Sequence, residues 1–219
     1  GYTVDVYRGK LEPCKSFLEF ALFVSFFPQL VAGPIIRASN FLPQLREKIT
    51  EVGTHYRLRI ISIENKNLKM GITLMAFGFL KKMFFADNIA PLVDDIFVNP
   101  IGAESFTIIL GAIAFGIQIY GDFSGYSDIA IGAALVLGLK IPINFNSPYK
   151  SKSIVEFWQR WHISFTTFIT TYVYTPIVRS FKKITFEKAM LATVISMLIV
   201  GVWHGSTINF VIFGFLHGV

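Results

Sequence analysis

The sequence predicts an all-α fold: a polytopic membrane helix bundle with broken or re-entrant helices and interfacial amphipathic helices. Its 219 residues are 53% hydrophobic with a mean hydropathy of +0.56. Only 16% of them are charged, against about 25% in a typical soluble domain. Residues 189–219 contain no Asp, Glu, Lys or Arg, a run long enough to cross a hydrocarbon core of about 30 Å. We expect residues 1–219 to form a single membrane-embedded core that is an internal piece of a longer chain.

The excess of basic residues points to lipid headgroups rather than to nucleic acid. The formal net charge is +6, but the Lys and Arg residues lie mostly in short polar connections between apolar runs, as the positive-inside bias requires. The single cysteine, Cys14, excludes an intramolecular disulfide and a cysteine-based metal cluster. Membrane lipid is therefore an expected partner, whereas nucleic acid and a metal ion are not.

The first apolar run, residues 20–36, is interrupted by Pro28 and Pro34. Because proline removes a backbone donor and clashes in a helix interior, the run predicts a spanning or re-entrant helix with a broken end. A polar connection follows at residues 37–69, rich in Lys and Arg. We expect it on the cytoplasmic face, with His55 as a solvated surface histidine.

The next apolar run, residues 71–93, is split by Lys81 and Lys82, whose ammonium groups we expect to reach the membrane interface. Residues 105–121 are uncharged and just long enough to span. Together these runs predict a segment that is a tilted helix or bends back, followed by a spanning helix.

Two carboxylates, Asp122 and Asp128, then stand between the run 105–121 and a further apolar stretch. The serines and glycines between them predict a helix junction that lines something polar. The favoured interpretation is structural, with both carboxylates acting as helix caps. A direct role in the chemistry is the alternative.

Residues 144–161 have apolar side chains at steps of three or four, including Trp158 and Trp161. This pattern is typical of an amphipathic helix lying in the membrane interface. Such a helix would deliver His162 to the start of the uncharged run 163–178.

The most informative stretch is Gly-Val-Trp-His-Gly at residues 201–205, which places His204 inside an uncharged segment. An ionisable group at membrane depth usually faces a protein-lined cavity and is a functional hypothesis by default. A histidine satisfied by a neighbouring helix is the alternative. Because one short connection separates the runs that hold His162 and His204, we expect the two to be neighbours.

Two histidines in a membrane-embedded cavity suit proton transfer, with His204 as general base and His162 as a positioning or relay group. Trp203 and Asn209 are available as donors to a developing oxyanion. A histidine-ligated metal oxygenase is weakly supported, because no close histidine pair has ligand spacing. A transporter stays open as the non-enzymatic alternative.

Four stretches, in order, closely resemble motifs of the membrane-bound O-acyltransferase family: residues 27–35, 122–132, 157–164 and 201–205. Within the family, the bacterial alginate O-acetyltransferase branch is most similar. The resemblance implies a multi-helix bundle around a tunnel, with the catalytic histidine at His204 and a second functional histidine at His162. Expected substrate-tunnel or positioning residues are Trp203, Asn209, Trp161, Asp122 and Asp128.

The resemblance also implies the reaction. An acetyl group from a cytoplasmic donor, acetyl-CoA, passes across the bacterial inner membrane toward an extracytoplasmic polysaccharide, through an extracytoplasmic acetyltransferase partner and without a bound cofactor. D-alanyl or other acyl transfer to a cell-wall polymer is the second expectation. The chain departs from the family after Ser164, where relatives tend to carry Arg-Asp-Tyr and this sequence has Thr170-Thr171-Tyr172. The acceptor is therefore left open.

Overall fold

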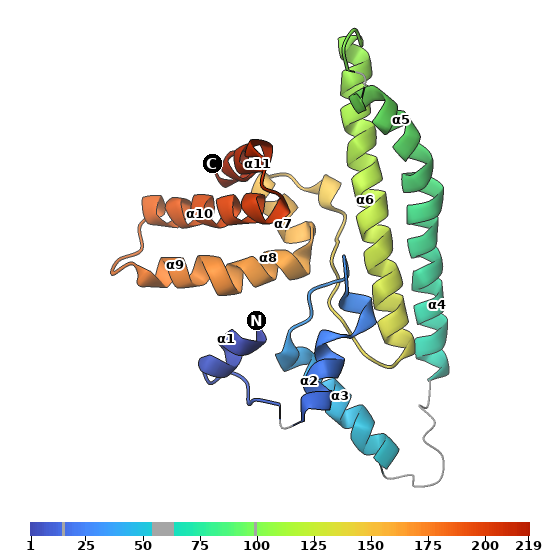
Figure 1. Ribbon diagram of the computed structural model, residues 1–219, viewed down its shortest axis with the longest axis vertical. Coiled ribbons are helices and arrows are strands. Elements are labelled where there is room, and N and C mark those ends of the chain that lie inside the picture. The colour runs from blue at the N-terminus through green and yellow to red at the C-terminus, as the bar shows by residue number, and fades with distance from the viewer. Residues whose placement is uncertain (15, 54–63, 99) are drawn as a thin grey trace. The chain divides into compact units, whose positions relative to one another are not determined.

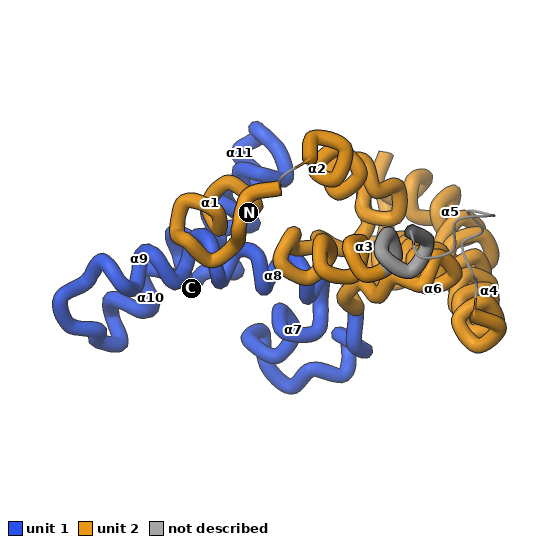
Figure 2. Tube along the Cα trace, turned by 90° about the horizontal axis from the view of Figure 1, so that it is seen from below, with its two compact units in different colours: residues 1, 145–219 blue, residues 2–144 orange. Residues whose placement is uncertain are grey.

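The computed structural model describes residues 1–14, 16–53, 64–98 and 100–219, and every regular element in these ranges is helical. His55 lies outside the described residues. The chain divides into two compact units, residues 2–144 and residues 145–219 together with Gly1 (Figure 2). Among the described residues, two helices, one in each unit, are long and apolar enough to cross a membrane. The wider expectation of a polytopic bundle with re-entrant helices stays a prediction.

The larger unit begins with short helices: α1 (Tyr2–Tyr7), α2 (Phe17–Val24) and η1 (Phe27–Gln29). A spanning helix over residues 20–36 is wrong, since α2 has eight residues and is about 12 Å long at 1.5 Å per residue. It ends where the Ser25 hydroxyl and N–H both bond the carbonyl of Ala21. The broken end is confirmed, because Pro28 stands in the first turn of η1.

The polar connection at residues 37–69 contains a helix of its own, α3 (Ala38–Gly53). Phe41 and Leu42 on α3 are buried in a core cluster with Ala130 and Ala134. The Gln44 amide also donates to the carbonyl of Lys140 at 3.0 Å and accepts from the Lys140 N–H at 2.8 Å. The expected loop is therefore helical over much of its length because one face of it has a core to pack against.

A long helical pair forms the rest of this unit (Figure 1). One side consists of α4 (Asn65–Phe79), the π-helical segment η2 (Leu80–Ala86) and α5 (Asp87–Val98), all of which pack against α6 (Ser105–Val136). The 32 residues of α6 extend about 48 Å. This helix is one of the two candidate membrane spans.

Asp122 and Asp128 lie within α6, so the expectation of a helix junction with carboxylate caps is wrong. The Lys81 ammonium pairs with Asp128 at 2.5 Å, and that of Lys82 pairs with Asp122 and, at 3.3 Å, with Asp87. Both lysines thus pair with carboxylates of α6, and Lys82 also pairs with Asp87 at the start of α5. That their ammonium groups reach the membrane interface stays a prediction. Because these pairs compensate the charges of Asp122 and Asp128, α6 can continue past both carboxylates.

The smaller unit contains the segments expected to carry the chemistry. Its elements are η3 (Pro148–Lys150), α7 (Ile154–Arg160), α8 (Ile163–Ile169), the π-helical η4 (Thr170–Tyr174), α9 (Thr175–Ser180), α10 (Phe186–His204) and α11 (Ile208–Gly218). The segments α8, η4 and α9 follow one another without interruption, and α10 runs back beside them (Figure 1). Next, α11 packs on α10 so closely that a methyl group at Gly201 would overlap the carbonyl oxygen of Phe210.

Candidate active site

The stretch 144–161 contains one α-helix, α7 (Ile154–Arg160), and local hydrogen bonds fix both its ends; its position in the membrane interface stays a prediction. The Ser153 hydroxyl accepts the N–H of Glu156 at 3.1 Å, and the Glu156 carboxylate accepts the N–H of Lys152 at 2.8 Å. That backbone N–H, and after it the Arg160 guanidinium, hold the pKa of the Glu156 carboxyl below its usual value. Arg160 also donates to the carbonyl of Asn146 at 3.1 Å. The helix is therefore held at its start and tied to the preceding loop at its end.

A two-residue reversal joins α7 to α8. Trp161 is extended, and His162 has the left-handed conformation φ 45°, ψ 53°. This conformation is uncommon outside glycine and costs about 1–3 kcal/mol, which the surrounding structure has to offset. The carbonyl of His162 accepts the N–H of Thr166 at 2.9 Å, in the first turn of α8. The position of the imidazole is thus set by the turn between two helices.

One phenylalanine ring connects the two histidines. Phe165 stacks on His162 with ring centroids 5.0 Å apart, and its ring meets His204 edge to face at 6.4 Å. It also stacks on Trp203 at 4.8 Å. Both His162 and Phe165 are buried. The prediction that His162 and His204 are neighbours is confirmed, since α8 and α10 bring them to the same ring.

His204 is the last residue of α10 and is exposed in the structure. Its imidazole packs on Phe210 at 6.3 Å and edge to face on Phe213 at 6.0 Å, both from α11. That the imidazole faces a protein-lined cavity stays a prediction. The side chain is exposed because α10 ends at His204, and α11 covers only part of that end.

Of the other predicted site residues, some lie beside the two histidines and others lie elsewhere in the chain. Trp203 joins the histidines through Phe165, but Trp161 packs on Phe145 and Phe157 instead. Asn209 is exposed in the first turn of α11, where its side chain has no hydrogen bond to any described residue. Asp122 and Asp128 belong to the other compact unit, where their partners are lysines.

Three rings that sequence reasoning missed surround the histidines: Phe165, Phe210 and Phe213. Phe165 has a usable signal, because it stands three residues after His162 in a helix, where side chains meet on one face. Phe210 and Phe213 have no such signal in the sequence, since the turn between α10 and α11 decides which rings of α11 face His204.

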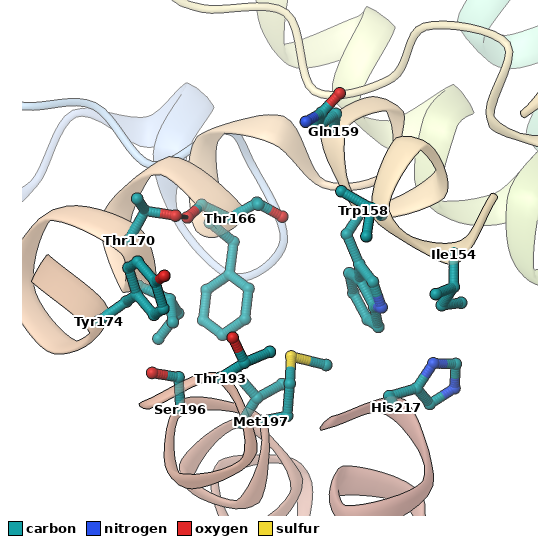
Figure 3. A pocket seen from close by; sticks show the side chains of 14 residues that line it. Ile154, Trp158, Gln159, Thr166, Thr170, Tyr174, Thr193, Ser196, Met197 and His217 are labelled. Atoms are coloured by element: carbon teal, nitrogen blue, oxygen red, sulfur yellow. Dashed lines mark hydrogen bonds between the residues drawn. The ribbon is translucent and has the colours of Figure 1, made fainter. Parts of the chain in front are cut away.

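Phe165 also lines a cavity of about 460 Å³ between α7, α8 with η4, α10 and α11 (Figure 3). Trp158 extends into this cavity from α7, and His217 faces it from α11. The indole nitrogen of Trp158 is buried. Its ring therefore points inward, whereas an interfacial anchor would present that nitrogen to headgroups.

The arrangement is suited to proton transfer. An exposed imidazole at a helix end can reach a substrate hydroxyl, and a second, buried imidazole lies against the same ring. In the part of the chain that the structure describes, no three His, Cys, Asp or Glu side chains gather as metal ligands would.

Comparisons with known proteins agree with this chemistry. Residues 14–219 match the membrane-bound O-acyltransferase family. The chain is 38% identical to a probable alginate O-acetylase AlgI of Azotobacter vinelandii, over 99% of this chain and 40% of that protein. It is 38% identical to a peptidoglycan O-acetyltransferase of Helicobacter pylori, over 93% of this chain and 36% of that protein. It is 30% identical to a teichoic acid D-alanyltransferase of Bacillus subtilis, over 90% of this chain and 49% of that protein. The chain thus spans less than half the length of each of these relatives.

Proposed function

Because the chain belongs to the membrane-bound O-acyltransferase family, we propose that it forms the catalytic core of an O-acyltransferase that moves an acetyl group from cytoplasmic acetyl-CoA toward an extracytoplasmic polysaccharide. The observation that supports this best is the contact of one buried ring, Phe165, with both imidazoles. It joins the two histidines of separate motifs into one site.

In the proposed reaction, His204 is the general base. Its imidazole takes the proton of the acceptor hydroxyl, whose oxygen attacks the thioester carbonyl carbon. The carbon–sulfur bond breaks, and the thiolate leaves with the proton returned by the imidazolium. His162 positions the acceptor or relays the proton, while the Trp203 N–H is a candidate donor to the oxyanion. The protein thus contributes the general base and the groups that position the substrates. Acetyl-CoA is a substrate rather than a bound cofactor.

The proposed setting is the bacterial inner membrane, crossed several times. An extracytoplasmic acetyltransferase partner would pass the group on to the polysaccharide. Support comes from the two candidate spans and from the alginate O-acetylase name of one relative.

Transfer of D-alanyl to a cell-wall polymer is the second candidate function. The teichoic acid D-alanyltransferase of Bacillus subtilis, at 30% identity over 90% of this chain, favours it. The same base and attack would serve either acyl group, because each reaction is an acyl transfer that needs a proton removed from the acceptor. The donor supplied in the assay distinguishes the two.

The test is release of free thiol from acetyl-CoA by the purified full-length protein with its candidate partner. His204→Gln should abolish transfer with the membrane level unchanged, because a lost base typically costs about 10²–10⁴ in rate. Ser206→Ala, in the connection after α10, is the matched control and should stay near wild type. A transporter would still move its substrate without forming an acyl product. Near wild-type transfer by His204→Gln would show that the base is assigned wrongly.

A further inference from the structure

The larger unit has a pocket of about 320 Å³ where the end of η2 and the start of α5 pack on α6. Its volume lies at the lower end of the range of about 300–1,000 Å³ that is usual for small-molecule sites. The residues that line it are Ala86, Asp87, Phe115, Gln118, Ile119 and Asp122. Two carboxylates and one amide therefore share a small pocket with apolar side chains, within a single compact unit.

The carboxylates of this pocket outnumber the positive charge beside them. The Lys82 ammonium pairs with Asp122 and, at 3.3 Å, with Asp87. Both carboxylates thus lie around one nitrogen, and this group of three side chains has one negative charge in excess. Since an ionised carboxylate has about four lone-pair sites, the contact with Lys82 leaves each of them able to accept further hydrogen bonds. The pocket therefore favours a cation that can donate hydrogen bonds.

The amide of Gln118 adds an acceptor that has no donor. Its Oε1 is buried, and no donor in the described part of the chain lies within hydrogen-bonding distance of it. Buried polar groups in folded proteins nearly always have a partner, and an amide oxygen can only accept. This atom points to an N–H or O–H group supplied by a ligand.

The set of acceptors suits an ammonium group better than a metal ion. A hard cation such as Ca²⁺ takes about six to eight oxygen ligands, whereas the side chains that line this pocket offer oxygens only from Asp87, Gln118 and Asp122. In the described ranges of the chain, no three His, Cys, Asp or Glu side chains gather as metal ligands would. A primary ammonium carries three N–H donors, like that of lysine, and so matches these three acceptors.

The pocket lies where the uncharged part of α6 ends. Residues 105–121 carry no charge and extend about 26 Å at 1.5 Å per residue, close to the thickness of a hydrocarbon core of about 30 Å. Because α6 is a candidate membrane span, Asp122 then stands at the level of the lipid headgroups. Ile119 and Phe115, one and two turns before Asp122, give the pocket an apolar side toward the hydrocarbon.

We propose that this pocket binds the headgroup of a phospholipid that carries a primary ammonium. The ammonium donates to Asp87, Gln118 and Asp122. The Lys82 side chain is 39% exposed, and its ammonium is the donor for the lipid phosphate. A choline headgroup has the positive charge but no N–H, so the unpartnered Gln118 oxygen distinguishes the two headgroups. This binding is separate from the proposed acyl transfer.

The experiment measures lipid binding to the purified full-length protein by native mass spectrometry. The lipids are phosphatidylethanolamine, its monomethyl and dimethyl forms, and phosphatidylcholine, all with the same acyl chains. Wild type should bind phosphatidylethanolamine saturably, and the affinity should fall stepwise as methyl groups replace the N–H donors, by about tenfold or more in total. The charge stays the same along this series, so the fall reports the hydrogen bonds alone.

Two variants test the acceptors. Gln118→Leu keeps most of the volume and loses the oxygen, so the affinity for phosphatidylethanolamine should fall about tenfold while that for phosphatidylcholine stays unchanged. Asp87→Asn removes the excess charge and should weaken binding of both lipids. Asp94→Asn, at an exposed position of α5 outside the pocket lining, is the matched control and should bind both lipids as wild type does.

Competition tests whether a lipid is the source of the ammonium. Displacement of phosphatidylethanolamine by glycerophosphoethanolamine, but not by glycerophosphocholine or free ethanolamine, supports the headgroup site. Displacement by free ethanolamine at the same concentration would assign the pocket to a small amine and overturn the lipid proposal. Equal affinity of wild type for the ethanolamine and choline lipids, or the same preference in Gln118→Leu as in wild type, would also overturn it. The pocket and the two histidines belong to different units, and lipid binding needs no turnover, so either proposal can fail without the other.

Discussion

Phe165 and His162 are stacked, with ring centroids 5.0 Å apart and planes inclined by 17°. The two residues stand three positions apart, on the turn into α8 and in its first turn. Phe165 is 5% exposed and also contacts His204 and Trp203. Both imidazoles therefore contact one buried ring.

Replacing Phe165 should reduce turnover more than binding. Phe165→Leu keeps apolar volume but loses the flat ring, so kcat should fall up to about 10²-fold, the cost of misplacing a reacting group by about 1 Å. KM should change little, and Phe165→Tyr should restore much of the loss. The measurement is steady-state acetyl transfer. Phe168→Leu, on a ring that packs on Tyr172, is the control, and equal kcat in Phe165→Leu and Phe168→Leu would contradict the positioning role.

The left-handed backbone at His162 predicts an order among its variants. Asn tolerates this conformation well and keeps a hydrogen-bonding side chain, whereas a β-branched residue is a real outlier there. His162→Asn should retain the thermal midpoint and some activity, His162→Gln somewhat less, and His162→Val should be destabilised by about 1–3 kcal/mol. Thermal unfolding in detergent measures the order. Equal thermal midpoints for His162→Val and His162→Asn would contradict this, because they would show that the turn can leave the left-handed conformation without cost.

The ion pair between Lys81 and Asp128 should appear as a coupling energy. Asp128→Asn leaves an uncompensated ammonium between two long helices, so it should lower stability. The double variant with Lys81→Met should recover part of that loss, with a coupling of about 0.5–3 kcal/mol. Unfolding of the two single variants, the double variant and wild type measures it. Strict additivity of the two single effects would mean that the pair contributes nothing.

Protonation of Glu156 should loosen α7. The pKa of its carboxyl is depressed in the folded state, so its stabilising contribution is present above the ordinary carboxyl pKa of about 4.3. That contribution is lost as the pH falls through the lower, folded value. The difference in thermal midpoint between wild type and Glu156→Gln should thus be present at pH 7 and shrink below about pH 4. If the difference in thermal midpoint between wild type and Glu156→Gln did not depend on pH, the ionised carboxylate would not be what stabilises α7.

Long uncharged runs and short connections were readable from the sequence. The position of His204 in α10 and the proximity of His162 follow from such a run and a single short loop. Pairing between distant segments was not readable: Lys81 and Asp128 look like breaks in two separate apolar patterns until the helices are side by side. The same limit explains the short α2, because apolar composition alone does not report where Pro28 and its neighbours stop a helix.

Within the candidate site, the structure brings the two histidines and Trp203 onto the Phe165 ring, whereas the role expected of Asn209 stays a prediction. Nearness in sequence was the only argument for Asn209. The rings of α11 that do contact His204 depend on how α11 turns back, which is a tertiary property.

The tight packing of α11 on α10 has a consequence for comparing relatives. A methyl group at Gly201 would overlap the Phe210 carbonyl oxygen, and one at Gly205 would overlap the Phe210 ring. Both glycines are thus held by space alone, whatever His204 does. A relative that keeps these glycines but has lost the histidine between them would retain the helix pair and lack the proposed base. In this motif the two glycines report how α11 packs on α10, independently of the proposed role of His204.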